Sequence, residues 1–522
     1  FQRPSPKPRQ FLGDGLPAEV TQGLPRATIA DCDNAKAVVL LGSDLKEDLP
    51  VLYLRLRRAA VELGIPLIDI AARDSGLSRY ASAKVRHLPG DAGSVVERLV
   101  AAAGTLDLTG DPDLDAAAAA LRDETRAGDV VVVLGRSSLA ERPEAIVRAA
   151  ASLAALPGVR FLSALRRGNV HGALDMGLAP GMLPGRVTLD EGRAWFEDAW
   201  GGLPATRGLD TEGILRAAAG GKIRTLIILG SNVISDFPDR ALANRALGAI
   251  GSVIAVGAFV TEASKYSDVV LPAALWGEKS GTTTNIEGRV LRLARKVTPA
   301  DTSLSDWRIA AELALRFDAD FDLETIEEVQ SEIARVAPAY RGVDASALSR
   351  AADGIVVPMR ESEVRIVTAS PVPAADASDA PDDAEPETLA ADTDVDVPPA
   401  YVWDRKASAA EPPTPDSYAL RLVSTHTLYD EGLMVSKSPH LSKLPAEAVL
   451  LVSSTDSDRL GVVDGGKVRV TSATGSLVVP VRADTGTPKG VAWIAFNQSG
   501  AGAADLIDSG APVTDVRVET AQ

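Results

Sequence analysis

The chain has 522 residues, a net charge of −17 and a single cysteine, Cys32. The negative charge argues against nucleic acid and anionic membrane surfaces as direct partners. One cysteine and four dispersed histidines (His87, His171, His426 and His440) are too few for an iron–sulfur cluster or a structural zinc site, and they exclude a disulfide framework. No run of about 18 uncharged apolar residues occurs, so the sequence predicts no membrane helix.

The length predicts about three domains, preceded by an amino-terminal extension at residues 1–34. The first residue is Phe1 rather than Met, and no signal-peptide pattern follows, so we expect the chain to be the later part of a longer subunit. Cys32 lies in this extension outside any CxxC context. We expect it to be a small, partly buried thiol rather than a metal ligand.

Residues 35–165 alternate short apolar strands with helical stretches. Strands are expected at 37–41, 66–70 and 130–134, and helices at 50–63 and 143–156. This alternation predicts a parallel sheet covered by helices, which is a Rossmann-like, doubly wound α/β domain. The same rhythm returns within residues 166–345 and predicts a second α/β domain, with strands at 225–229, 254–256 and 269–271.

Three of these strands end in similar phrases, LLGSD, VLGRS and ILGSN. Each phrase places a glycine and a small polar residue at the carboxyl end of a strand. Ligands bind at this edge of a doubly wound sheet, because backbone N–H groups and helix N-termini face the crevice. The same residues also suit a strand-to-helix turn with its helix cap, so the phrases alone leave both interpretations open.

A glycine-rich block, GNVHGALDMGLAPGMLPG, occupies residues 168–185 and predicts a meandering loop rather than regular structure. Asn169, His171 and Asp175 are candidates for a site in this loop. A single histidine in a glycine-rich loop is more often a hydrogen-bonded structural residue, which is the interpretation we favour.

The most distinctive segment, residues 259–296, reads FVTEASKYSDVVLPAALWGEKSGTTTNIEGRVLRLARK. It combines a short strand that ends at a proline, a threonine-rich loop at 281–285, and Glu287-Gly288-Arg289. It resembles the signature region of the molybdopterin oxidoreductase family, T-E-x-x-x-x-A-D-V-V-L-P followed by E-x-x-G-T-x-x-N-x-E-G-R. LGSNVISD at 229–236 is similar to the family's G-x-N-P loop near the pterin nucleotide, with Val233 in place of the usual proline.

The resemblance implies a surface that faces the pterin in active members. Its candidate vestiges in this chain are Gly230, Ser231, Asn232, Thr261, Glu262, Gly281, Asn285, Glu287 and Arg289. We expect no catalytic residue, no metal ligand and no bound cofactor here. Members that hold molybdenum commonly ligate it through a cysteine, selenocysteine or serine, often after a cysteine-rich segment, and nothing like that segment occurs here. We expect Glu287 and Arg289 to be structural.

Residues 346–417 are predicted to be a linker. Its stretch from 370 to 416 is rich in Ala, Pro, Asp and Glu, which predicts a solvated tether, and Tyr401 and Trp403 could anchor its end on a neighbouring surface. Residues 418–522 change to short alternating strands with Gly/Asp turns, which predicts a β-barrel. This part resembles the family's dinucleotide-binding barrel, with Thr425-His426-Thr427 and Asn497-Gln498-Ser499 at comparable strand ends.

Residues 168–185, the LGSN phrase and the long signature follow the order and spacing of one branch of the family, the G subunit of bacterial proton-pumping NADH-quinone oxidoreductase (respiratory complex I). This resemblance implies a non-catalytic scaffold part of a translocase component in the peripheral arm, supporting electron transfer from NADH to quinone. It also implies iron–sulfur clusters in a part of the subunit that precedes this chain, and other peripheral-arm subunits as partners. The implied location is the cytoplasmic side of the bacterial inner membrane, without direct insertion.

Two alternatives remain open. The first is an active pterin-dependent oxidoreductase, similar to formate dehydrogenase, that is truncated of its iron–sulfur and metal-ligand segment. The second is a free-standing nucleotide-binding module, which rests on the LGS turns alone.

Overall fold

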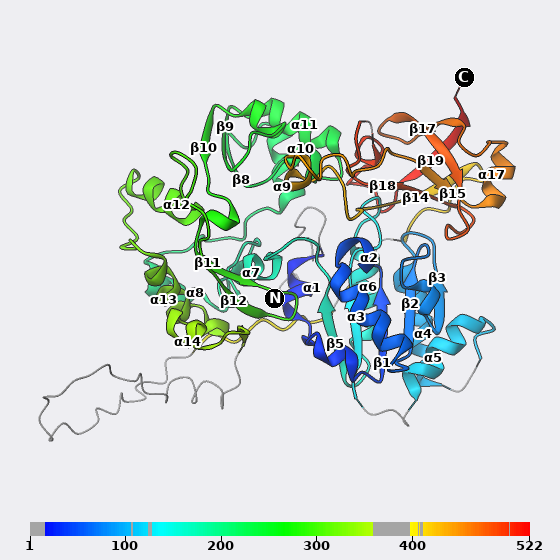
Figure 1. Cartoon of the computed structure of the whole chain (residues 1–522), viewed down its shortest axis with the longest axis horizontal. Coiled ribbons are helices and arrows are strands. Elements are labelled where there is room, and N and C mark those ends of the chain that lie inside the picture. The colour runs from blue at the N-terminus through cyan, green and yellow to red at the C-terminus, as the bar shows by residue number, and fades with distance from the viewer. Residues whose placement is uncertain are drawn as a thin grey trace, which may run out of the picture.

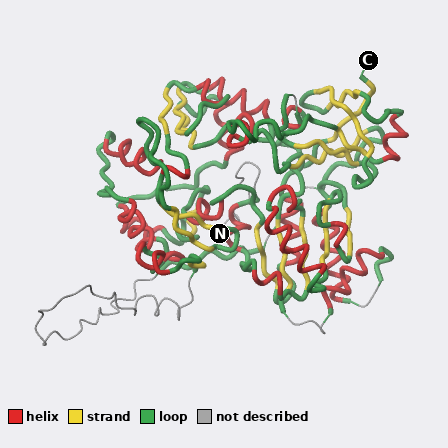
Figure 2. Tube along the Cα trace, in the orientation of Figure 1, coloured by secondary structure: helices red, strands yellow, loops and turns green. Residues whose placement is uncertain are grey.

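The computed structural model describes residues 16–105, 108–123, 128–358, 397–405, 407, 411–500 and 502–521. These residues form two α/β domains and a closed β-barrel, which confirms the predicted fold class. In Figure 1 the barrel lies above the first α/β domain, and the second α/β domain lies beside both. Figure 2 shows the same arrangement, with the strands of the first sheet running side by side between helices.

The first α/β domain is built on a parallel sheet with the strand order β3-β2-β1-β4-β5. Its strands are β1 (Ala37–Leu41), β2 (Leu67–Ala71), β3 (Ala83–Arg86), β4 (Val130–Leu134) and β5 (Val159–Ser163). Its helices are α1 (Ala18–Gly23), the 3₁₀ helix η1 (Ala30–Asp33), α2 (Leu45–Asp48), α3 (Pro50–Val61), η2 (Ser78–Tyr80), α4 (Ala92–Gly104), α5 (Pro112–Arg122) and α6 (Glu144–Leu153).

Alternate side chains of the central strands lie on opposite faces of this sheet. Val39 and Val132 belong to the core that includes residues of α4, α5 and α6, whereas Val38 and Val131 belong to the core that includes residues of α3. A parallel sheet covered on both faces needs apolar residues at nearly every position, which explains why β1 and β4 are uninterrupted apolar runs.

The second α/β domain holds a parallel sheet, β10-β9-β8, an antiparallel sheet, β11-β12-β13, and the β6-β7 pair. Its strands are β6 (Met182–Leu183), β7 (Val187–Thr188), β8 (Thr225–Leu229), β9 (Ser252–Gly257), β10 (Val269–Pro272), β11 (Gly281–Thr284), β12 (Arg289–Leu293) and β13 (Ile355–Val356). Its helices are α7 (Val170–Asp175), α8 (Arg193–Trp200), α9 (Thr211–Ala219), α10 (Val233–Asp236), α11 (Arg240–Ala249), η3 (Ala263–Tyr266), η4 (Trp276–Glu278), α12 (Asp306–Leu315), α13 (Ile326–Val336), η5 (Pro338–Tyr340) and α14 (Ala345–Arg350).

Two segments of this domain are more regular than the sequence predicts. The block 168–185 contains helix α7 and strand β6 rather than loop throughout. Gly172 inside α7 allows a close approach, because a Cβ there would collide with the Asn169 side chain and come within 3.1 Å of the Thr284 hydroxyl. Residues 345–356, most of which the sequence assigns to the linker, form α14 and β13, and β13 pairs with β12.

The barrel closes in the order β14-β18-β15-β17-β16-β19. Its strands are β14 (Ala419–Thr425), β15 (Leu450–Val452), β16 (Lys467–Thr471), β17 (Ser476–Ala483), β18 (Val491–Ala495) and β19 (Asp515–Thr520), and its helices are α16 (Leu433–Ser436), α17 (Ser454–Leu460) and η6 (Ala503–Asp505). Val468 and Val470 of β16 point into the core while their neighbours are exposed, as the alternating pattern predicts.

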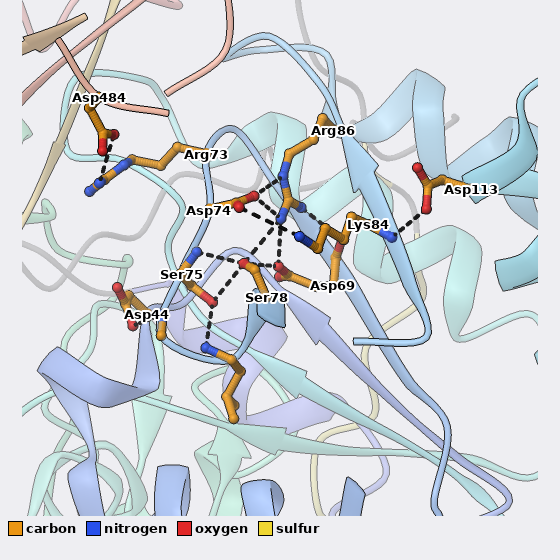
Figure 3. Close-up of polar contacts among 12 residues, drawn as sticks. Asp44, Asp69, Arg73, Asp74, Ser75, Ser78, Lys84, Arg86, Asp113 and Asp484 are labelled. Atoms are coloured by element: carbon orange, nitrogen blue, oxygen red, sulfur yellow. Dashed lines mark hydrogen bonds and ion pairs between the residues drawn. The ribbon is translucent and has the colours of Figure 1, made fainter. Parts of the chain in front are cut away.

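The barrel docks directly on the first α/β domain. The Leu139 N–H donates to the Ser424 carbonyl at 2.7 Å, and the Thr514 N–H donates to the Ala140 carbonyl at 2.9 Å. Arg73 reaches Asp484 of the barrel at 3.7 Å and lies over the Trp493 ring. Figure 3 shows Arg73 pointing at Asp484 beside a second network, in which Arg86 pairs with Asp69 at 2.8 Å and with Asp74 at 2.6 Å.

Most of the predicted acidic tether, including residues 370–396, lies outside the described residues. The end of the tether is described and packs on both α/β domains. The Tyr401 N–H donates to the Arg186 carbonyl at 2.7 Å, and the Trp403 N–H donates to the Gly23 carbonyl at 3.1 Å. Trp403 is buried in the first core, so these two aromatic residues anchor the segment as the sequence predicts.

Candidate functional site

Two adjoining cavities of about 550 and 650 Å³ separate the first sheet, the second α/β domain and the barrel. We call them together the crevice. Both cavities are lined by Asp48, Arg166, Arg167, Gly230, Ser231 and Asp236. These residues follow the carboxyl ends of β1, β5 and β8, so the crevice lies where doubly wound sheets bind ligands.

Three strands end in Leu-Gly, in the segments LLGSD, VLGRS and ILGSN. In the turn that follows each of them, a serine hydroxyl donates a hydrogen bond to a carboxylate. The pairs are Ser43 Oγ to Asp48 Oδ2 at 3.0 Å, Ser231 Oγ to Asp236 Oδ2 at 3.1 Å, and Ser137 Oγ to Glu141 Oε1. Asp236 Oδ2 also accepts the Asn232 N–H at 3.0 Å. Carboxylates of the chain itself therefore engage the donors that would otherwise be free to meet an anionic ligand.

Two consecutive arginines after β5 hold the walls of the crevice together. Arg166 pairs with Asp430 of the barrel at 2.8 Å, and Arg167 pairs with Asp236 of the second α/β domain at 3.3 Å. The φ angle of Arg167 is 79°, in the left-handed region that costs a non-glycine residue roughly 1–3 kcal/mol. The two side chains leave one turn towards different domains, so this turn cross-links all three.

The carboxylates of the crevice differ in their electrostatics. Burial would raise the pKa of Asp430, but hydrogen bonds from His426 and Arg166 outweigh it and hold that pKa well below its usual range. The Nδ1 atom of His426 lies 2.7 Å from Asp430. Burial raises the pKa of Asp48 to about 6, although the charge of His426 and the hydrogen bond from Ser43 lower it. One carboxylate is thus fixed in charge, while the other titrates close to neutral pH.

The structure divides the residues that the sequence singles out into two groups. Gly230 and Ser231 line the crevice, and Thr261 lines its smaller cavity. A third cavity of about 440 Å³, between the second α/β domain and the barrel, is lined by Thr261, Asn232 and Glu262, and by Asn497 and Gln498.

The second group consists of Gly281, Asn285, Glu287 and Arg289, which lie on or beside the β11-β12 hairpin and line none of these three cavities. Asn285 Oδ1 accepts the N–H groups of Glu287 and Arg289, at 3.1 and 2.9 Å. Glu287 Oε2 accepts the N–H of Ile29, which precedes the first sheet. This hairpin forms a joint between the two α/β domains.

The cysteine and the histidines lie apart from one another. Cys32 is buried in the core that includes residues of α3, and His87 and His171 contact backbone carbonyls, whereas His440 is exposed. Within the described ranges, no group of three or more His, Cys, Asp or Glu side chains is arranged to hold a metal ion.

Four residues that line the crevice were not predicted from the sequence: Asp48, Arg166, Arg167 and Asp430. A signal for Asp48 was present, because an acidic residue stands seven positions after the strand-ending leucine in each of LGSDLKED, LGRSSLAE and LGSNVISD. No comparable signal marks the partnership of Arg166 with Asp430, which are 264 positions apart.

Two family patterns match the sequence. The one described as Molybdopterin oxidoreductase matches residues 15–316, and the one described as Molydopterin dinucleotide binding domain matches residues 420–517. Among curated proteins, the NADH-quinone oxidoreductase G subunit 2 of Rhizobium meliloti is 29% identical over 486 residues, which are 88% of this chain and 52% of that protein.

A second relative, the F420-dependent formate dehydrogenase 1 subunit alpha of Methanococcus maripaludis, is 24% identical over 529 residues, covering 92% of this chain and 75% of that protein. Among solved structures, acetylene hydratase from Pelobacter acetylenicus has the same fold, with a TM-score of 0.59 and 14% identity over 97% of this chain and 80% of that one. The chain spans about half the length of the first curated relatives it matches. No helix among the described residues is long and apolar enough to cross a membrane.

Proposed function

The chain belongs to the molybdopterin oxidoreductase family, and we propose that it is the non-catalytic scaffold part of the G subunit of an NADH-quinone oxidoreductase. Its similarity to such G subunits over most of its length supports this branch of the family. In this proposal the iron–sulfur clusters lie in a part of the subunit outside these residues. The partners are the other peripheral-arm subunits, and the complex lies on the cytoplasmic side of the bacterial inner membrane.

The proposal rests on the carboxylates Asp48 and Asp236, which lie within the turns that follow β1 and β8. A turn that holds a nucleotide phosphate offers free N–H and hydroxyl donors to the ligand. Here Ser231 and the Asn232 N–H donate to Asp236, and Ser43 donates to Asp48. A phosphate at either turn would have to displace a carboxylate of like charge, so neither turn is suited to hold a phosphate.

The family implies a molybdopterin cofactor with its metal, and the described residues do not fit that group. Cys32 is fully buried at the amino-terminal edge of the first sheet, opposite the crevice, and burial raises the pKa of its thiol to about 12. The thiolate that binds metals is therefore not formed near neutral pH. The crevice carboxylates Asp430 and Asp236 are engaged by Arg166 and Arg167.

The proposal is tested on the native complex, purified through a tag on this chain. We expect a multi-subunit assembly that oxidises NADH and contains molybdenum, tungsten and extractable pterin far below the amount of chain. A Ser231→Ala variant should change only stability, because its hydroxyl contacts Asp236. Stoichiometric metal and pterin in the wild type, with pterin lost from the variant, would overturn the scaffold proposal.

The second candidate function is an active pterin-dependent oxidoreductase similar to formate dehydrogenase. The size of the crevice favours it, because cavities of about 550 and 650 Å³ suit a cofactor. A stretch of 178 residues that is 38% identical to an F420-dependent formate dehydrogenase alpha subunit of Methanocaldococcus jannaschii also favours it. The same metal and pterin measurement separates the two candidates.

A further inference from the structure

A buried polar cluster lies apart from the crevice, where α1, the glycine-rich block and η5 meet. Its members are Gln22, Arg26, His171, Asp175, Arg186 and Tyr340. None of them lines the three cavities described above. Gln22 and Asp175 are fully buried, and Arg186 is 8% exposed. Two of its members, His171 and Asp175, belong to the block 168–185, and the proposed function assigns them no role.

The cluster has one positive charge in excess. Arg26 pairs with Asp175 at 3.6 Å. Burial and the neighbouring Arg26 lower the pKa of Arg186 to about 10, so the Arg186 guanidinium is charged near neutral pH. Among the side chains that the structure describes, Asp175 is the one carboxylate that acts on Arg186, the other groups being Arg26 and Tyr340.

The remaining titratable members do not balance this charge. Burial and Arg26 lower the pKa of His171 to about 4, which leaves its ring neutral. Burial also raises the pKa of Tyr340, which keeps its hydroxyl protonated. The nearby Glu287 is paired with Arg289 at 2.7 Å, so these two cancel each other.

Several buried polar atoms of the cluster accept or donate no hydrogen bond within the described part of the chain. The donors are both Nη atoms of Arg26, Nε of Arg186 and Nε2 of Gln22, and the acceptors include Oε1 of Gln22 and Oδ1 of Asp175, which lies 3.6 Å from Arg26 Nη2. Nε2 of His171 lies 3.1 Å from the Ser163 carbonyl and therefore carries the proton, which leaves Nδ1 as an unused acceptor. Buried unpaired donors around an excess positive charge are costly unless a counter-charge satisfies them.

We propose that a small monovalent anion, of the size and charge of chloride, binds between Arg26, Arg186 and Gln22. One negative charge neutralises the excess, whereas a divalent anion would reverse it. The N–H groups of the two arginines and of the Gln22 amide are the donors that such an anion needs, and the enclosure of the cluster favours a small ion. Water alone would satisfy the donors but would leave the charge.

The anion would join α1 to the glycine-rich block and stabilise the adjacent signature hairpin. Arg26 Nη1 lies against Gly288, whose φ of 82° suits glycine and where a Cβ would collide with that nitrogen. Arg186 Nη2 donates to the Gln22 carbonyl, so its guanidinium is held beside the same helix. The site is structural and lies outside the crevice.

Crystals of the full-length protein grown in bromide test the site directly. An anomalous peak between the two guanidinium groups and the Gln22 amide supports the proposal, and a density without anomalous signal overturns it. In solution, hydrogen–deuterium exchange of residues 170–176 should slow as chloride replaces a bulky organic anion at constant ionic strength. The apparent midpoint of unfolding should rise by roughly 2–4 °C for each ten-fold increase in chloride above Kd. A bromide peak without these solution effects would show binding at crystal concentration only, and would also overturn the proposal.

A Gln22→Glu variant makes the test specific, because its carboxylate supplies the missing charge. We expect its exchange to be slow at every chloride concentration and its bromide peak to be absent. Gln330→Glu is the matched control, since Gln330 is also buried but already donates to the Val343 carbonyl at 3.0 Å. The control should keep the chloride dependence of the wild type. A Gln22→Glu protein that still requires chloride would overturn the proposal, and the wild-type measurements decide the question if the variant does not fold.

Discussion

Replacing Glu287 with glutamine should loosen the joint between the two α/β domains without altering the crevice. The Glu287 carboxylate accepts the Ile29 N–H at 2.8 Å, across 258 positions of sequence. Its other oxygen accepts Arg289 Nε at 2.7 Å and Asn285 Nδ2 at 3.3 Å. Glutamine keeps the shape but has one acceptor oxygen, so its NH₂ group must face either the Ile29 N–H or the Arg289 guanidinium.

The expected loss of stability follows from these contacts. A hydrogen bond to a charged group contributes about 1.5–3 kcal/mol, and a buried donor left unpaired costs about 1–3 kcal/mol. The Arg289 side chain is 32% exposed, so solvent weakens the contribution of its ion pair with Glu287 to stability. We expect Glu287→Gln to destabilise this joint by roughly 2–4 kcal/mol, and Arg289→Ala to destabilise it by less.

The loss of stability in Glu287→Gln should depend on pH in a definite direction. Burial would raise the pKa of Glu287, but hydrogen bonds from Ile29, Arg289 and Asn285 outweigh it and lower that pKa below its ordinary value of 4.5. A carboxyl with a lowered pKa contributes its stability above the ordinary value and loses it as pH falls through the folded-state value. The difference between wild type and Glu287→Gln should therefore be full at neutral pH and shrink below pH 4.5.

Hydrogen–deuterium exchange of residues 26–33 and denaturant unfolding measure this loss. Glu312→Gln is the control, because Glu312 pairs with Arg316 on an exposed face and should change stability by no more than about 0.5 kcal/mol. A Glu287→Gln or Arg289→Ala complex that assembles with normal stability but has lost turnover would refute the structural role.

Three further predictions concern the barrel, the tether and the crevice. Arg421, which is buried, pairs with Asp515 inside the barrel and donates to the Pro89 carbonyl of the first domain at 2.9 Å, so Arg421→Met should destabilise the barrel and its docking together by about 3–5 kcal/mol and expose the boundary to limited proteolysis; unchanged proteolysis would contradict this. Replacing residues 374–396 with a Gly/Ser linker of equal length should leave assembly unchanged, and loss of assembly would identify a docking arm. Because burial raises the pKa of Asp48 to about 6, its charge costs stability above that pH. Asp48→Asn should therefore stabilise the protein by roughly 1–3 kcal/mol at pH 7.5 and have little effect below pH 4, and a less stable variant at pH 7.5 would refute the argument.

The sequence predicted the sheets and the barrel because local patterns determine them. Uninterrupted apolar runs such as 130–134 occur where both faces of a strand are covered, and the alternation at 467–471 occurs where one face is buried. Helix α7 was not predicted because its glycine is a helix breaker by propensity, whereas the space that this glycine leaves is filled by the Asn169 side chain, which accepts the Thr284 N–H in a tertiary contact.

The crevice was harder to predict than the fold. The glycines and small residues of the LG phrases were recognised, but their partners stand several positions later and become visible only as hydrogen bonds. The link between Arg166 and Asp430 depends on how the barrel docks, which no local pattern encodes. The signature hairpin shows the opposite case, because its motif is conspicuous in the sequence while its side chains contact a neighbouring domain.

The ion pairs of Arg166 with Asp430 and of Arg167 with Asp236 join the walls of the crevice to one another. In a site that closes on a cofactor, the ligand supplies the contacts that hold the walls together. Here Arg166 reaches the barrel and Arg167, whose φ lies in the left-handed region, reaches the second α/β domain from the same turn. Since His426 and Arg166 keep Asp430 ionised throughout the neutral range, the link to the barrel does not depend on pH there. In the scaffold proposal, a crevice whose walls are joined by these ion pairs keeps the outer surfaces of the three domains in a fixed relation to one another.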